Sequence, residues 1–128
     1  MTEHFHVIVW IDHSEARVFH VGSEDADRQV ISTHVHDRQQ HRKAHSIGSG
    51  HAPVDNEFFG RVAQSIQTAG ALLIVGPANA KTELATYIKN HLPELAKRIS
   101  AVEPLDHPSD GQLVALARKF FRADDRMR

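Results

Sequence analysis

The sequence predicts an α/β fold in which helices pack on a mixed five-stranded sheet, and two observations lead to this class. First, four consecutive apolar residues at 72–75 end at Gly76 and Pro77, which is typical of a short strand buried on both faces. Second, an apolar period of 3.6 residues begins directly afterwards and predicts a helix over 78–92. A strand that leads at once into a helix requires further strands beside it and helices on its faces.

The residues before this unit predict three antiparallel strands. Residues 5–11 are rich in β-branched and aromatic side chains, and residues 16–21 follow after a short polar break, so the two stretches predict a hairpin. Residues 29–35 predict the third strand. Because short connections join these three stretches, we expect neighbouring strands to run antiparallel.

Three further elements complete the prediction. An apolar stripe predicts a helix over 54–69, with Gly70 as its stop signal. Residues 99–102 predict the last strand, and Ser109 is the expected N-cap of a final helix. The resulting order is β-β-β-α-β-α-β-α, in which the fourth and fifth strands run parallel to their neighbours because helices connect them.

Composition bounds the class of protein. The 128 residues predict a single domain at 5–122, followed by a charged tail at 123–128 that we expect to fray. We expect no membrane helix, because no apolar run approaches about 20 residues, and no signal peptide. The absence of cysteine excludes disulfides and cysteine nucleophiles and favours a cytoplasmic location. The net charge of −1 argues against a globally basic nucleic-acid binder.

The strongest functional signal is the stretch at 36–53, which has no hydrophobic period and concentrates several of the 11 histidines. A loop this long inside a compact domain is usually functional or disordered. Its arginine and lysine side chains suit the phosphates of RNA, and its histidines add charge below about pH 6.5. A solvated loop without a partner is the alternative. The predicted RNA-binding residues are Arg38, His41, Arg42, Lys43, His45, Gly48, Gly50 and His51.

A histidine-based metal site is a second alternative. His34, His36, His41 and His45 have spacings that are able to bind zinc, and imidazole is a common zinc ligand. However, their spacing matches no recognised zinc motif, and the chain has no thiolate to complete such a site. We therefore predict no metal and no other cofactor.

Catalytic residues have weaker support. Asp12, His13 and Ser14 are adjacent, but a hydrolytic triad is assembled in space, so this tripeptide more simply predicts an Asx turn. A hydrolase acting on peptidyl-tRNA or RNA is the enzymatic alternative, with Asp12 or His51 as its candidate catalytic residue. A nuclease would also need carboxylates that gather around two metals. The acids available at strand ends for that purpose are Asp12, Glu15, Asp106 and Asp110.

Three stretches resemble the central domain of the archaeo-eukaryotic class-1 peptide-chain release factors and Pelota. Residues 7–19 (VIVWIDHSEARVF) resemble its opening hairpin, and residues 73–84 (LIVGPANAKTEL) resemble its strand, glycine turn and helix start. Residues 99–106 resemble the following strand, so the likeness covers roughly 5–122. The chain is most similar to small bacterial proteins of that superfamily, often labelled translational machinery proteins. The resemblance implies an RNase H-like fold and a role at the ribosome.

The resemblance also limits the activity. In the release factors, a loop between the third strand and the first helix carries Gly-Gly-Gln, enters the peptidyl-transferase centre and promotes hydrolysis of peptidyl-tRNA. The corresponding loop here has Gly48-Ser49-Gly50-His51 and no glutamine at that motif. The resemblance therefore implies a translation-associated protein that binds the ribosome, tRNA or rRNA without releasing peptides. An exposed edge strand leaves a homo-oligomer open.

Overall fold

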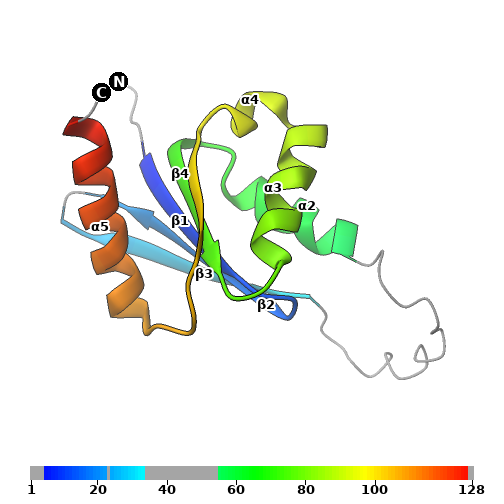
Figure 1. Cartoon of the computed structure of the whole chain (residues 1–128), viewed down its shortest axis with the longest axis horizontal. Helices are drawn as coiled ribbons and strands as arrows, with labels where there is room; N and C mark the ends of the chain where they lie inside the picture. Colours follow the sequence, from blue (N-terminus) through cyan, green and yellow to red (C-terminus); the bar gives the residue numbers. More distant parts are fainter. Residues whose placement is uncertain (1–4, 23, 34–54, 127–128) are drawn as a thin grey trace.

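The computed structural model describes residues 5–22, 24–33 and 55–126 of the chain. The described elements follow the predicted order, with a short additional helix that has Pro93 in its first turn. They are β1 (Phe5–Ile11), β2 (Glu15–Val21), β3 (Ala26–Ser32), α2 (Asp55–Ser65), β4 (Ala69–Gly76), α3 (Ala80–His91), α4 (Pro93–Ala96), β5 (Ile99–Pro104) and α5 (Asp110–Arg126), as Figure 1 shows.

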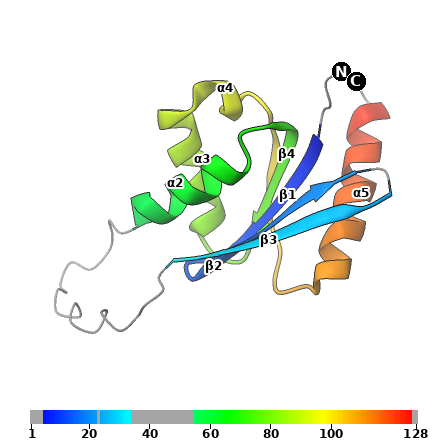
Figure 2. The same cartoon turned by 180° about the vertical axis from the view of Figure 1, so that it is seen from behind.

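The strands form one mixed sheet in the order β3-β2-β1-β4-β5. β1 pairs antiparallel with β2, and β2 pairs antiparallel with β3. β4 pairs parallel with both β1 and β5. Figure 2 shows β3 as an outer strand of this sheet. The predicted α/β class, the mixed five-stranded sheet and the strand directions are therefore confirmed.

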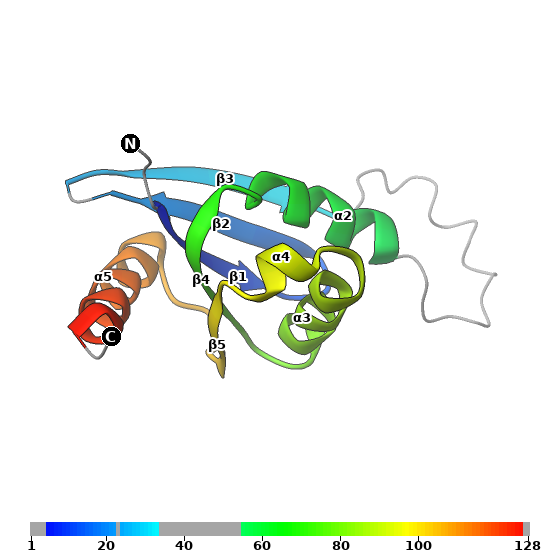
Figure 3. The ribbon, with the colours of Figure 1, turned by 90° about the horizontal axis from the view of Figure 1, so that it is seen from above.

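Helices cover both faces of the sheet. Figure 3 shows α5 on one face, and α2, α3 and α4 on the other. Side chains alternate between the two faces along β1, because successive residues of a strand point in opposite directions. Ile8 and Trp10 pack in the cluster under α5, whereas Val7, Val9 and Ile11 pack in the cluster under the other helices. β1 is thus buried on both faces at the centre of the sheet.

The unit of β4 and α3 forms as the sequence predicts. Every residue from Leu72 to Val75 is buried, and the strand ends at Gly76. On α3, Leu84 and Ile88 are fully buried, and Tyr87 packs against the same core. Each such aliphatic side chain contributes about 1.5–3 kcal/mol relative to an exposed position. The hydrophobic run and the helical period therefore locate the centre of the fold correctly.

Gly76 occupies a position that only glycine fits. Its φ is 155°, and a Cβ placed on it would lie 2.1 Å from the carbonyl oxygen of Ile11. Leu105 donates its backbone N–H to the carbonyl oxygen of Gly76 at 2.9 Å. The end of β4 is thus pressed against the end of β1 on one side and joined to the chain beyond β5 on the other.

The predicted boundaries of β3 are wrong. The strand begins at Ala26, three residues before the predicted start, because Gly22 donates to the carbonyl oxygen of Asp25 at 2.8 Å and closes a tight turn. Asp27 and Arg28 are exposed on this outer strand, so they give no apolar alternation. The strand ends at Ser32, and the last two residues of the predicted strand lie outside the described residues.

The predicted end of α2 is also wrong. The helix ends at Ser65, and the residue that we expected to stop it, Gly70, lies inside β4. The chain turns through hydrogen bonds from Ile66 N–H to the Ala63 carbonyl oxygen (3.2 Å) and from Ala69 N–H to the Ile66 carbonyl oxygen (3.0 Å). Ile66 in this turn and Ala69 at the start of β4 are both buried, so the apolar pattern continues beyond the helix.

α5 begins with the cap that the sequence predicts. Ser109 Oγ accepts from the Gln112 N–H at 3.1 Å, and Gln112 Oε1 accepts from the Ser109 N–H at 2.9 Å, which is a capping box. The helix continues to Arg126, so helical backbone extends beyond the domain end that we placed at 122. No helix in the described ranges combines the length and the apolar character that crossing a bilayer requires.

Candidate functional site

The predicted RNA-binding residues lie outside the described part of the chain. This holds for Arg38, His41, Arg42, Lys43, His45, Gly48, Gly50 and His51, and also for the metal candidates His34 and His36. The RNA-binding and metal-binding assignments of these residues therefore stay predictions. Of the candidate site residues, the structure describes Asp12, and it describes the residues on both sides of 34–54.

The described residues on both sides of 34–54 lie at one end of the sheet. Thr33 donates its N–H to the carbonyl oxygen of Ser14 at 2.9 Å, which joins the exit from β3 to the β1–β2 turn. Arg61 on α2 donates to the carbonyl oxygens of Ser32 at 2.8 Å and Thr33 at 3.3 Å. Figures 1 and 2 show the end of β3 and the start of α2 on the same side of the molecule. This is also the end of the sheet at which β1, β4 and β5 finish.

Asp12 forms the predicted Asx turn. Its Oδ1 accepts from the backbone N–H groups of Ser14 at 2.8 Å and Glu15 at 2.9 Å. The Asp12 N–H donates to the carbonyl oxygen of Glu15 at 3.0 Å, which closes the turn between β1 and β2. A structural role therefore accounts for one carboxylate oxygen of Asp12.

Replacing Asp12 with alanine should lower the free energy of unfolding by about 1–2 kcal/mol, because two backbone donors lose a charged acceptor. Asp12→Asn keeps an oxygen at Oδ1 and should retain most of that stability. Urea unfolding followed by circular dichroism gives both values. Equal losses in the two variants would show that the charge, and not the acceptor geometry, stabilises the turn.

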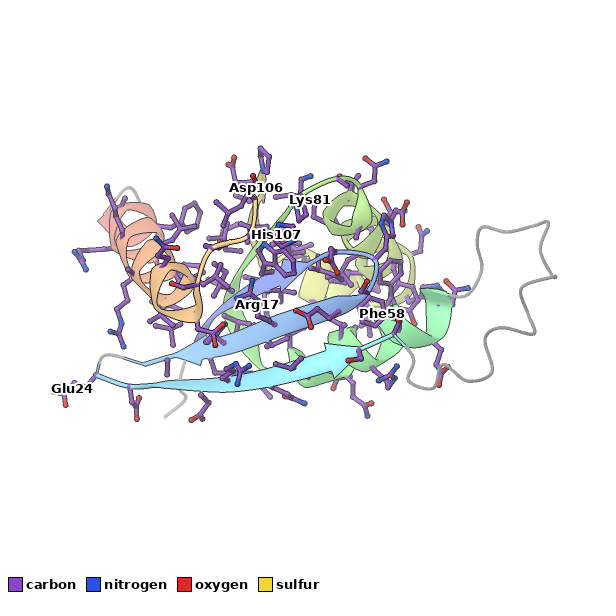
Figure 4. All side chains as sticks on the ribbon, turned by 90° about the horizontal axis from the view of Figure 1, so that it is seen from below. Arg17, Glu24, Phe58, Lys81, Asp106 and His107 are labelled. Atoms are coloured by element: carbon purple, nitrogen blue, oxygen red, sulfur yellow. The ribbon has the colours of Figure 1, made fainter. Side chains whose placement is uncertain are left out.

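The second oxygen of Asp12 faces the connection between β5 and α5. Asp12 Oδ2 lies 3.9 Å from His107 Nε2, and Asp106 Oδ1 lies 3.6 Å from His107 Nδ1. Figure 4 shows Asp106 and His107 together on this connection. The Asp106 side chain is 94% exposed. Asp12 and Asp106 thus flank an imidazole, and they do not converge on a common point.

Glu15 and Asp110 are engaged by arginines. Arg17 NH1 donates to Asp110 Oδ1 at 2.9 Å, and Arg17 Nε lies 4.0 Å from Glu15 Oε2. Arg28 Nε lies 2.9 Å from Asp110 Oδ2. The four acids named from the sequence therefore follow one end of the sheet, but each faces a basic group. Within residues 5–22, 24–33 and 55–126, no group of three potential ligands is arranged to hold a metal ion.

Sequence reasoning missed Arg17, which is the most enclosed charged side chain at this end, with 13% of its side chain exposed. Its guanidinium lies 4.5 Å from the ring centroid of Trp10 and donates to the Pro108 carbonyl oxygen at 3.1 Å. Trp10 Nε1 donates to the Asp106 carbonyl oxygen at 2.6 Å. These contacts fasten the β5–α5 connection to the sheet. The only sequence signal was an arginine among the apolar residues of a strand.

Two further ionisable side chains on α3 complete this end of the sheet. Glu83 Oε1 lies 3.3 Å from His13 Nε2, which links α3 to the β1–β2 turn across two exposed side chains. Lys81 Nζ donates to the carbonyl oxygen of Ala78 in the turn that precedes α3. None of the polar or charged residues that the structure describes is fully buried. At this end of the sheet, the described ionisable side chains are therefore paired with neighbouring groups and partly exposed to solvent.

Comparison with known proteins supports the fold. No family model and no curated protein sequence matches this chain. Pelota from Archaeoglobus fulgidus is similar with a TM-score of 0.64 at 17% identity, covering 92% of this chain and 32% of that one. Pelota from Thermoplasma acidophilum is similar with a TM-score of 0.57 at 13% identity, covering 84% and 30%.

An archaeal translation termination factor is similar with a TM-score of 0.55 at 14% identity, covering 94% of this chain and 39% of that one. The chain therefore spans between 30% and 39% of the length of these three proteins. At these identities the likeness shows the fold, which is the fold that the sequence resemblance implied.

Proposed function

We propose that this chain is a translation-associated protein that binds rRNA or tRNA through the basic segment, defined as residues 36–51. The observation that carries the proposal is the shared fold, which extends over 92% of the chain for an archaeal Pelota and 94% for a translation termination factor. The basic segment has three arginine or lysine side chains and one acidic side chain, on a chain whose net charge is −1. Positive charge is what phosphate contacts require.

The surroundings of the segment support this assignment. Its described neighbours in the sequence join the β1–β2 turn and α2 at one end of the sheet. At that end, Arg17 and Arg28 already share the carboxylate of Asp110. This carboxylate offsets part of the positive charge of the two arginines, so the three basic side chains of the segment are the better candidates for RNA contact.

The proposed activity is binding, and it does not include peptide release. In the release factors that the sequence resembles, the glutamine of Gly-Gly-Gln is part of the releasing motif. The nearest counterpart here is Gly48-Ser49-Gly50-His51, which has no glutamine. A protein that binds the ribosome in this way works in the cytoplasm.

Reversing the charge of Arg38, Arg42 and Lys43 to glutamate should release the protein from ribosomes. The measurement is co-sedimentation with ribosomes in sucrose gradients at several salt concentrations. We expect affinity to fall at least tenfold, and the slope of log K against log salt to flatten by up to ~3, because each lost phosphate contact removes about one released counterion.

The matched control reverses three exposed lysines of the described body, Lys89, Lys97 and Lys119. This variant carries the same change in net charge, and it should keep its affinity if the segment makes the contacts. The proposal fails if the wild-type protein does not sediment with ribosomes at low salt. It also fails if the control variant loses as much affinity as the segment variant.

A further inference from the structure

The outer edge of β3 carries backbone groups that the sheet does not use. Hydrogen bonds from Thr33 N–H to Ser14 and from Gly22 N–H to Asp25 mark the two ends of the β2–β3 ladder. Both bonds continue the register that pairs Glu15 with Ser32 and Val21 with Ala26. They therefore identify which residue pairs of this ladder are hydrogen-bonded. Antiparallel pairing alternates, so every second residue of β3 directs its N–H and C=O away from β2. Those outward-facing residues are Ala26, Arg28, Val30 and Ser32.

This edge is not blunted by proline or by a bulge, and its only charged residues are Asp27 and Arg28. β3 contains no proline, and its register with β2 is unbroken over all seven residues. The other outer strand, β5, ends at Pro104 and pairs with β4 through a register shift. Natural edges are commonly blunted by proline or by bulges. Val30, on β3, is 41% exposed and is the only exposed large hydrophobic residue in the described part of the chain.

We propose that β3 pairs antiparallel with β3 of a second copy of this chain, with Gln29 directly opposite Gln29 across a two-fold axis normal to the sheet. Such an axis keeps each side chain on its own face only if it passes midway between the two copies of one residue. An axis through Asp27 or Arg28 would place like charges directly opposite each other, which is destabilising. Gln29 is the middle residue of β3, so its register pairs all seven residues of the strand, whereas an axis through Val30 leaves Ala26 and Asp27 without partners inside β3.

The register through Gln29 places each charged residue of β3 opposite an aliphatic residue. It places Arg28 opposite Val30 of the second copy, so no like charges meet and the exposed valine is covered. On the other face it places Asp27 of the second copy opposite Ile31, on the side where α2 presents Arg61. A groove of about 460 Å³ lies there and is open to receive that strand. Its lining residues are Gln29, Val30, Ile31, Ser32, Arg61, Gln64 and Ser65.

The antiparallel arrangement also brings opposite charges together at the two ends of β3. The labelled Glu24 marks the β2–β3 turn, and the labelled Phe58 marks α2 at the opposite end of β3. An antiparallel partner brings its acidic turn, with Glu24 and Asp25, toward α2 of the first copy, where Arg61 is exposed. The same contact is made twice by symmetry.

Engineered disulfides test the register, because the chain has no cysteine of its own. In the proposed pair, Gln29 faces its own copy at a non-hydrogen-bonded position, where Cα atoms are about 4.5 Å apart and a disulfide fits. Gln29→Cys should therefore give a covalent dimer on oxidation with glutathione disulfide. Asp27→Cys is the matched control: it is exposed on the same face, but its two copies lie about 13 Å apart along the strands. Non-reducing electrophoresis separates the products.

Sedimentation velocity of the cysteine-free protein tests the association itself. We expect a reversible dimer of the 14.3 kDa chain that increases with concentration. Val30→Lys should weaken dimerisation at least tenfold, because it faces Arg28 of the second copy, whereas Val30→Glu should not weaken it. Residue 30 also pairs with Arg17 in its own sheet, so thermal melts of both variants check folding.

The results divide clearly. Selective crosslinking of Gln29→Cys, together with a concentration-dependent dimer, supports the pairing. A wild-type chain that stays monomeric at every concentration overturns it. Equal crosslinking of both cysteine variants, or crosslinking of neither, overturns the register.

Discussion

Replacing Gly76 with alanine is expected to destabilise the protein by about 3 kcal/mol, which is a large part of the 5–15 kcal/mol typical of a domain. The φ of 155° disfavours any side chain, and the new Cβ would meet the Ile11 carbonyl oxygen at 2.1 Å. The Cβ is fixed to the backbone of β4 and the oxygen belongs to the backbone of β1, so relief requires the ends of these two strands to separate. The measurement is the free energy of unfolding in urea, followed by circular dichroism.

Gly111→Ala is the matched control for this substitution. Gly111 lies in the first turn of α5, and a Cβ there meets nothing within 4 Å. Alanine favours helix over glycine by up to about 1 kcal/mol, so this variant should be neutral or more stable. A Gly76→Ala protein as stable as the wild type would mean that the ends of β1 and β4 separate at little cost.

Replacing Trp10 with alanine is expected to cost about 3–5 kcal/mol, which is the usual range for deleting a buried aromatic side chain. Trp10 is 1% exposed and packs with Leu73, Leu113 and Phe121 beneath α5. Its removal also deletes the hydrogen bond to the Asp106 carbonyl oxygen and the ring that lies under Arg17. Urea unfolding measured by circular dichroism is the appropriate readout, because Trp10 is the only tryptophan of the chain.

Trp10→Phe separates packing from hydrogen bonding. Phenylalanine keeps an aromatic ring but has no N–H, so it should lose about 1–2 kcal/mol for the unpaired carbonyl oxygen of Asp106. Lys119→Ala, at an exposed position on α5, should change stability by less than about 0.5 kcal/mol. If Trp10→Phe is as unstable as Trp10→Ala, the hydrogen bond and not the packing of the ring stabilises this connection.

The sequence predicted best the helices and strands that are buried along one whole face or on both faces. The residues at 72–75, and Leu84 and Ile88 in the helical period, are apolar and are all buried. Hydrophobicity alone therefore identified these two elements. The start of β3 was missed because Asp27 and Arg28 are exposed at the outside of the sheet and show no alternation. A hydrophobic pattern predicts which residues are buried. It predicts a paired strand only where the residues of that strand are also buried.

The candidate site was less predictable for a different reason. Residue type and local spacing identified the Asx turn of Asp12, because its hydrogen bonds reach only two and three residues along the chain. The pairing of Arg17 with Asp110 and the position of His107 between two acids depend on contacts between distant segments. No local pattern encodes those contacts. The role of the basic segment was inferred from composition and resemblance, and it stays a prediction.

The hydrogen bond between Thr33 and Ser14, and the contact of Arg61 with the end of β3, have a consequence for how this protein is able to evolve. They define the two anchor points between which residues 34–54 are inserted. Doubling the length of chain between two fixed points raises the free-energy cost of closing it by only about 0.6 kcal/mol. Insertions and deletions between these anchors are therefore compatible with folding, so the length of this stretch is free to change while the scaffold remains intact.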